Sequence, residues 1–301
     1  MSAVSIIKGS IKLAGLLFRP TSHSTKLPGL VVIHPTGGVK EQTARTYAQK
    51  LSQQGYVAIC YDASHQGESE GLPRYLEDPA ARATDASAVV DYLQRLDYVD
   101  SNRIGVVGIC AGGGYAVAAA KGDHRFKAVA VVGAVSMGHG VRLGRSGTDN
   151  PAEKVGVLDH VAQAVRAEAD GGEAVTIPIV SPTLDENPTK DARDTYEYYL
   201  TPRAQHPNSP NKMLLRSMQL LMNFDPWHLA DIYLTQPVLM IAGEKASTRW
   251  HTEMLFKVLD GKNKGLKKVI LPHGGHIDLY DQEEYVNPAV NEIAGFFKQA
   301  I

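Results

Sequence analysis

The stretch Gly108-Ile109-Cys110-Ala111-Gly112-Gly113-Gly114 decides the fold, because it joins an apolar strand-like run to a helical run of small residues. Small residues two positions before and after the centre are what a tight, strained strand-to-helix turn requires, since larger side chains would collide there. Such a turn presents Cys110 at a helix N-terminus, where the positive end of the helix dipole favours a thiolate. The backbone N–H of Ala111 would point at a developing oxyanion. The pattern therefore predicts that Cys110 is a nucleophile.

The alternative interpretation is that Cys110 is a core cysteine and that the glycines only let a helix and a strand pack closely. That interpretation suits the second cysteine, Cys60, which lies in the middle of a predicted strand. It suits Cys110 less well, because the strand, the turn and the helix all fall in register around it.

Outward from this turn, short apolar runs alternate with helical patterns. The predicted strands are Val4–Ile7, Ile11–Phe18, Leu30–His34, Tyr56–Tyr61, Ile104–Ile109, Phe126–Val132, Pro237–Ala242 and Lys268–Leu271. The predicted core helices are Gln42–Gln53, Asp78–Leu96, Ala111–Ala120, Thr248–Leu259 and Pro288–Gln299. This rhythm predicts an α/β fold with a mostly parallel central sheet and helices on both of its faces.

The rhythm breaks between residues 137 and 235, which we interpret as a cap or lid inserted into a core of residues 1–136 and 236–301. Helices are predicted near Glu153–Ala169 and over Asp191–Leu200. Two aromatic residues of the insertion, Tyr198 and Trp227, either line a substrate pocket or form the cap's own core. We expect the cap to determine substrate choice and the core to supply all of the chemistry.

A second oxyanion donor is expected in the loop His34-Pro35-Thr36-Gly37-Gly38, where the N–H of Thr36 or Gly37 would serve. A general base is expected after the last strand, where both His273 and His276 occur. We favour His276, because the two glycines before it let the loop bend back toward the turn.

The acid that would orient this histidine is expected after the strand Pro237–Ala242. Glu244 is the only carboxylate in that turn, so it is the first candidate, and the alternative is that it is an exposed loop acid. Asp278 is a substitute. A Cys–His pair depends less on an acid than a Ser–His pair does, because a thiol ionises more easily.

Composition excludes several classes of function. The chain has 301 residues and a net charge of −1, so it has no basic excess with which to bind nucleic acid. The chain has two cysteines, too few for a disulfide framework. This low cysteine content is typical of proteins in the reducing cytoplasm. No apolar run approaches the length of a membrane span.

We interpret Asp62, His65, Glu68 and Ser69 as a solvated loop rather than a metal site. No cofactor is expected, because no acidic residue ends the strand after Gly112-Gly113-Gly114, as a dinucleotide site would require.

Five stretches together resemble the dienelactone hydrolase-like group of the α/β-hydrolase superfamily, in particular its larger members with a cap. They are residues 34–42, 61–69, 71–79, 108–115 and 275–280. The resemblance implies that Cys110 is the nucleophile, that His276 is the base and that Thr36 belongs to the oxyanion loop. Relatives commonly read Ala-Asp-Thr where this chain reads Ala246-Ser247-Thr248, so the acid that the group implies falls on a serine.

We therefore expect a hydrolase that cleaves an ester, lactone or thioester through an acyl-cysteine intermediate. Its substrate would be a small acyl compound, either free or attached to a carrier. One alternative is an acyltransferase that uses the same site. Another is a non-catalytic binding protein on a decayed hydrolase scaffold, supported only by Ser247 at the position of the acid. A homodimer is one assembly that the sequence leaves open.

Overall fold

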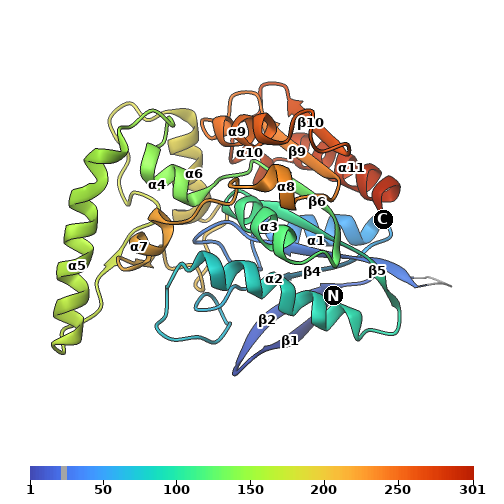
Figure 1. The fold of residues 1–301 in the computed structure, drawn as a ribbon, viewed down its shortest axis with the longest axis horizontal. Coiled ribbons are helices and arrows are strands. Elements are labelled where there is room, and N and C mark those ends of the chain that lie inside the picture. Colours follow the sequence, from blue (N-terminus) through green and yellow to red (C-terminus); the bar gives the residue numbers. More distant parts are fainter. Residues whose placement is uncertain (22–25) are drawn as a thin grey trace.

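The computed structural model describes residues 1–21 and 26–301. At its centre is a sheet of eight strands, in the order β1-β2-β4-β3-β5-β6-β9-β10 (Figure 1). The strands are β1 Ser2–Lys8, β2 Ile11–Phe18, β3 Leu27–Ile33, β4 Val57–Tyr61, β5 Val99–Ile109, β6 Phe126–Val132, β9 Val238–Gly243 and β10 Leu266–Leu271. β1 and β2 are antiparallel to their neighbours, and from β4 onward the strands run parallel. The predicted α/β class and mostly parallel sheet are confirmed.

Helices cover both faces of this sheet, because its inner strands are apolar on both sides. One face packs against α1, Thr43–Gln53, and α11, Glu283–Ala300. The opposite face packs against α2, Pro79–Gln94, α3, Ala111–Gly122, and α9, Arg249–Leu259. Because the strands from β4 to β10 are parallel, their carboxyl ends lie at the same edge of the sheet. In α/β proteins this edge is where ligands bind.

The predicted insertion lies between β6 and β9, which pair directly with each other in parallel. Its elements are α4 Met137–Leu143, the 3₁₀ turn η1 Pro151–Lys154, α5 Val155–Ala169, β7 Thr176–Ile177, α6 Lys190–Leu200, β8 Met213–Leu214, α7 Ser217–Met222 and α8 Ala230–Tyr233. Most of them project to one side of the sheet, with α5 farthest from it, whereas α8 lies beside α3 of the core (Figure 1). A short helix, α10 Asp278–Asp281, follows β10 in the core.

Two elements begin five residues before the positions that the sequence pattern predicts. β5 begins at Val99 rather than at Ile104, because a polar stretch of residues 100–103 hides its first half. α11 begins at Glu283, five positions before Pro288, which lies inside the helix. The proline removes the intrahelical hydrogen bond that an N–H at this position would donate to the carbonyl oxygen of Glu284, and the helix nevertheless continues through it.

Candidate active site

Cys110 lies at the turn between β5 and α3, in the strained conformation that the sequence predicts. Its φ of 55° lies in the left-handed region, although it is not a glycine. A Cβ on Gly108 would lie 2.2 Å from the carbonyl oxygen of Gly112, and one on Gly112 would lie 2.3 Å from the carbonyl oxygen of Ile33. Both positions therefore require glycine, and the turn holds the half-buried thiol at the carboxyl end of β5.

The Cys110 sulfur and the imidazole of His276 form a hydrogen-bonded pair. Burial alone would raise the pKa of the Cys110 thiol, but the adjacent His276 and hydrogen bonds from His276, Tyr280 and the N–H of Ala111 bring that pKa below its usual value. Burial alone would lower the pKa of His276, and the Cys110 sulfur raises it above its usual value. Opposite shifts in two touching groups favour a thiolate–imidazolium pair.

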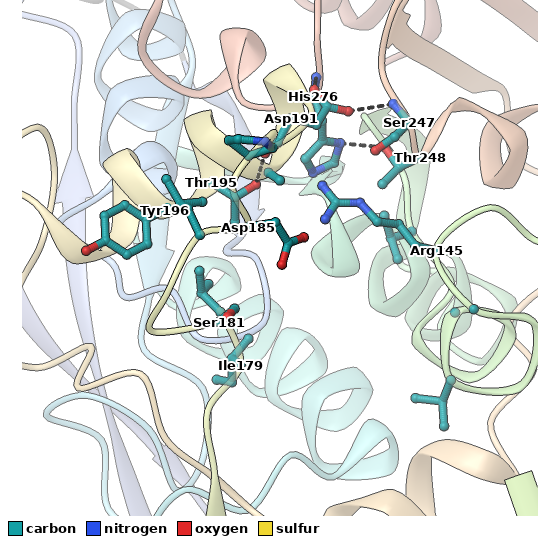
Figure 2. Close-up of a pocket in the computed structure, with 18 of the residues that line it drawn as sticks. Arg145, Ile179, Ser181, Asp185, Asp191, Thr195, Tyr196, Ser247, Thr248 and His276 are labelled. Carbon is teal, nitrogen blue, oxygen red and sulfur yellow. Dashed lines mark hydrogen bonds between the residues drawn. The ribbon is translucent and has the colours of Figure 1, made fainter.

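Thr248, rather than Glu244, is the partner of the His276 ring. The Oγ1 atom of Thr248 lies 2.6 Å from Nδ1 of His276, and Figure 2 shows the two side chains facing each other. The carboxylate of Glu244 instead accepts the backbone N–H of His273 at 2.9 Å, at an exposed edge. The expectation that Glu244 orients His276 is therefore wrong, because the turn after β9 directs Glu244 toward the outer part of the neighbouring loop.

Of the other two candidates in the histidine loop, Asp278 holds the loop in place and His273 lies at the surface. Asp278 accepts the backbone N–H of Gly275 at 2.7 Å and forms an ion pair with Lys190 at 2.8 Å. The side chain of His273 is 84% exposed, whereas His276 is buried. The structure thus brings His276 to the thiol and leaves His273 at the surface.

Asp191 reaches this loop from the insertion, on helix α6. One carboxylate oxygen accepts the N–H of His276 at 3.0 Å, and the other accepts the N–H of Ser247 at 2.6 Å. A charged group of the insertion thus contacts the backbone of His276, and no local pattern around Asp191 signals this contact. The expectation that the core supplies all of the chemistry remains a prediction.

Tyr280 is a second residue that the sequence analysis missed. Its buried hydroxyl lies 3.1 Å from Nε2 of His276 and also bonds to the Cys110 sulfur. Tyr280 follows His276 by four residues, and the turn at residues 276 and 277 that leads into α10 brings the two side chains together. The short spacing to the predicted base is the only sequence signal for it.

The predicted oxyanion loop follows β3 and touches the turn, since Gly112 packs against the carbonyl oxygens of Ile33 and His34. Within it, the hydroxyl of Thr36 donates to Glu77 at 3.0 Å. Gly37 has a φ of +73°, and Ile179 of the insertion packs against it. The assignment of its N–H, or that of Thr36, as the second oxyanion donor remains a prediction.

Behind this loop lies a buried polar network. Glu77 also accepts the hydroxyl of Tyr115 at 2.6 Å, and its carboxylate lies 3.5 Å from the guanidinium of Arg82. Arg82 in turn donates to the carbonyl oxygen of His34 at 2.6 Å. Because these groups are fully buried and interlinked, they hold the start of the oxyanion loop in one conformation.

A cavity of about 520 Å³ lies beside His276, between the insertion and the core (Figure 2). The guanidinium of Arg145 points toward His276 within it. Its apolar lining from the insertion comprises Met137, Val141, Ile179, Val180, Leu184 and Tyr196.

Tyr198 and Trp227, the two predicted pocket residues, do not line this cavity. The Tyr198 ring packs against Tyr199 and Tyr280, and its hydroxyl accepts the N–H of Thr43 at 2.9 Å. Trp227 is buried in the core cluster on the α3 face of the sheet. Both are packing residues, but they pack against the central core rather than forming a core within the cap, so neither of the two interpretations offered by the sequence describes them.

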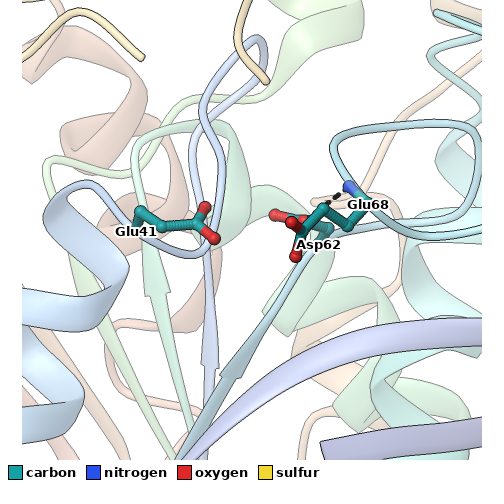
Figure 3. A group of neighbouring side chains, drawn as sticks. All are labelled: Glu41, Asp62 and Glu68. Atoms are coloured by element: carbon teal, nitrogen blue, oxygen red, sulfur yellow. Dashed lines mark hydrogen bonds between the residues drawn. The ribbon is translucent and has the colours of Figure 1, made fainter. Parts of the chain in front are cut away.

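Contrary to the interpretation from the sequence, the loop after β4 is not simply solvated, because Asp62 and Ser69 are buried; together with Glu41 before α1, its acids surround a lysine. Glu41, Asp62 and Glu68 bring carboxylate oxygens within 4.8 Å of one another (Figure 3). The buried ammonium of Lys40 forms ion pairs with these residues at 2.6, 2.8 and 2.6 Å, respectively. Lys40 therefore supplies the positive charge that this cluster requires.

Cys60 lies in the middle of β4 and is fully buried. Burial raises the pKa of its thiol, the opposite of the change at Cys110.

In the part of the chain that the structure describes, no helix has the length and apolar character needed to span a bilayer.

The profile of the Dienelactone hydrolase family matches residues 13–170, and the chain belongs to that family. Uncharacterized protein YcjY of Escherichia coli is 40% identical over 97% of this chain and 95% of its own length. The crystal structure of hypothetical protein PA2218 from Pseudomonas aeruginosa has a TM-score of 0.92 and 30% identity, covering 100% of this chain and 93% of that one. A thiohydrolase of Eupenicillium brefeldianum is 25% identical over 91% of this chain and 86% of its own. The protein is thus a hydrolase of the dienelactone hydrolase type.

Proposed function

We propose that the protein hydrolyses a small ester, lactone or thioester through an acyl intermediate on Cys110. The observation that carries the proposal is the thiol on the strained turn, hydrogen-bonded to His276 in a buried pair. A thiolate at a helix N-terminus is a strong nucleophile, and a paired imidazolium is a ready proton donor.

In the first half-reaction, the Cys110 sulfur attacks the carbonyl carbon and forms a C–S bond. The carbonyl oxygen becomes an oxyanion, which the N–H of Ala111 stabilises together with the N–H of Thr36 or Gly37. When this intermediate collapses, the bond to the leaving group breaks and His276 gives that group its proton. The products of this half-reaction are an acyl-cysteine and an alcohol or thiol, or the ring-opened hydroxyl end of a lactone.

In the second half-reaction, neutral His276 takes a proton from water, whose oxygen attacks the acyl carbon. Breakage of the C–S bond releases the carboxylic acid and restores the thiolate–imidazolium pair. The buried hydroxyl of Tyr280 donates to the sulfur in the resting pair and favours its departure as a thiolate.

The cavity beside His276 supports a substrate of modest size with an apolar acyl part. Its volume of about 520 Å³ lies in the range of small-molecule sites, and its lining from the insertion is largely apolar. The thiohydrolase among the relatives makes a thioester one of the substrates to test first.

The decisive experiment compares the two cysteines. Cys110→Ala should lower turnover of a p-nitrophenyl acyl ester and of an acyl thioester by ~10³-fold or more, because nucleophile and base act as a unit. Cys60→Ala is the matched control: it also removes a buried thiol, and it should leave turnover nearly unchanged. Intact-mass analysis during turnover should find one acyl adduct on the parent protein and none on the Cys110 variant. Retention of most activity without Cys110 would refute the proposal.

The same assay identifies the acyl acceptor. We expect added methanol to divert only a small share of the acyl group to the methyl ester, since water is the proposed acceptor. Predominant ester formation at low alcohol concentration would indicate an acyltransferase instead. A Cys110 thiol that resists iodoacetamide near neutral pH would indicate the non-catalytic scaffold.

A further inference from the structure

Asp191 is a buried carboxylate at the start of helix α6, and it joins two loops that belong to the core. Its side chain is 5% exposed, although the insertion around it is largely exposed. It bonds to the backbone N–H of Ser247 at 2.6 Å in the β9–α9 loop and to that of His276 at 3.0 Å in the β10–α10 loop (Figure 2). The Ser247 hydroxyl donates to the same carboxylate.

The two loops that Asp191 joins supply the two partners of one hydrogen bond, Thr248 in the β9–α9 loop and His276 in the β10–α10 loop. Thr248 follows Ser247 directly, and its Oγ1 lies 2.6 Å from Nδ1 of His276. Gly275 precedes His276, and a Cβ at that position would lie 2.9 Å from the Asp191 carboxylate. The glycine thus lets the carboxylate approach the loop closely. Fixing both backbones with one carboxylate fixes the distance between the hydroxyl and the imidazole.

The charge of Asp191 also acts on the imidazole. Burial would raise the pKa of Asp191, but its hydrogen bonds from Ser247 and from the N–H of His276 bring that pKa below its usual value, so it is a carboxylate at neutral pH. A negative charge this close favours the imidazolium form of His276. It does so without touching the ring, which bonds instead to Thr248.

We propose that Asp191, carried by the insertion, is the positioning acid of this hydrolase: it holds Thr248 against His276 and stabilises the imidazolium, so the site is complete only when the insertion is docked. The inference rests on the proposed role of the Cys110–His276 pair. It places the acid function near Ser247, the position at which the resemblance leads one to expect an aspartate, although the carboxylate comes from a different segment. The insertion then contributes to chemistry as well as to substrate selection.

The test compares Asp191→Asn with Asp194→Asn, one turn farther along the same helix. Asp194 pairs with Lys190 at 2.5 Å and has no contact with the histidine loop among the described residues. We expect Asp191→Asn to lower kcat on a p-nitrophenyl acetate substrate by roughly 10- to 100-fold with little change in KM, as losses of an orienting acid do. Asp194→Asn should change kcat by less than about twofold.

The readout that separates positioning from mere structural support is the pH dependence of Cys110 alkylation by iodoacetamide. The groups that face His276 are Cys110 and Tyr280 at the sulfur side, Asp191 at the backbone, and Arg145 and His251 across the cavity. Removing the Asp191 charge should destabilise the imidazolium and shift the thiolate limb upward by about one pH unit. An unshifted limb and an unchanged kcat in folded Asp191→Asn would overturn the proposal.

The strongest test is whether a second substitution restores the kcat that Asp191→Asn loses. The double variant D191N/S247D places a carboxylate in the β9–α9 turn itself, and it should recover at least about tenfold of the lost kcat. Failure of this rescue in a folded double variant would count against an acid role and favour simple docking.

Should Asp191→Asn not fold, Thr248→Val removes the hydroxyl that Asp191 is proposed to hold against His276 and leaves the insertion intact. It should lower kcat on the same ester, and an unchanged kcat in the folded variant would overturn the proposal. Failure of the proposed function looks different: turnover would persist in Cys110→Ala, while alkylation would still report how Asp191 affects the thiol.

Discussion

Replacing Tyr280 with phenylalanine removes one of three hydrogen-bond donors to the Cys110 sulfur, the others being His276 and the N–H of Ala111. A hydrogen bond to a charged group contributes about 1.5–3 kcal/mol, and one pKa unit corresponds to about 1.4 kcal/mol. The Tyr280→Phe change should therefore raise the pKa of the Cys110 thiol by about one to two units. Because the protonated thiol is the inactive form, the acidic limb of kcat/KM should move upward by the same amount.

The assay follows carboxamidomethylation of Cys110 against pH by intact mass, in a Cys60→Ala background so that a single thiol reacts. Tyr47→Phe is the control: its hydroxyl is also buried, and it donates to the carbonyl oxygen of Leu279 beside Tyr280 at 2.8 Å. It loosens the same short helix without touching the sulfur. If Tyr280→Phe and the parent gave superimposable alkylation profiles at equal thermal stability, the assigned role of the tyrosine hydroxyl would be refuted.

Four further predictions can be tested with the same proteins. Gly133→Ala should lower kcat at least tenfold, because its Cβ would lie 3.2 Å from the imidazole of His276 at a φ of +54°, and ester kinetics measure this. Glu244→Gln should change kcat by less than about twofold, since its carboxylate lies at an exposed loop edge; a tenfold loss would contradict that placement. Lys40→Met should cost about 3–5 kcal/mol of unfolding free energy in urea, because it leaves the buried carboxylate of Asp62 without its cationic partner. The kcat/KM profile should rise at a pH below the usual thiol value, as Cys110 ionises, and fall above the usual imidazole value, as His276 loses its proton; a single limb near pH 8.5 would contradict this.

The turn at Cys110, the central strands and His276 could all be predicted from short stretches of the sequence. The turn at Cys110 was predictable because steric limits act between residues only two positions apart, and Gly108 and Gly112 meet them. The strands of the central sheet were predictable from short apolar runs, with the exception of the polar first half of β5, whereas the two-residue strands β7 and β8 of the insertion were not. His276 was predictable because it follows the last strand of a recurrent chain order.

The remaining parts of the site depend on distant contacts that no local pattern encodes. Asp191 is separated by 85 residues from His276 and by 56 from Ser247, so its role follows only from how the insertion docks. Glu244 was chosen because it is the only carboxylate in its turn, but the direction of a side chain depends on the backbone around it. Tyr198 likewise reads as a pocket residue by composition, whereas packing against Tyr280 buries it in the interior.

The direct pairing of β6 with β9 bears on when, during folding, the Cys110 thiol meets His276 and Tyr280. Closing a loop of about a hundred residues before these strands meet adds little equilibrium cost, but it makes their contact a late event in folding. The turn with Cys110 can form from β5, β6 and α3 alone, whereas His276 and Tyr280 arrive with the strands beyond the loop. We therefore expect the Cys110 thiol of a refolding chain to lack its His276 and Tyr280 partners until β9 and β10 join the sheet. The appearance of fast alkylation at Cys110 would time that last step of assembly.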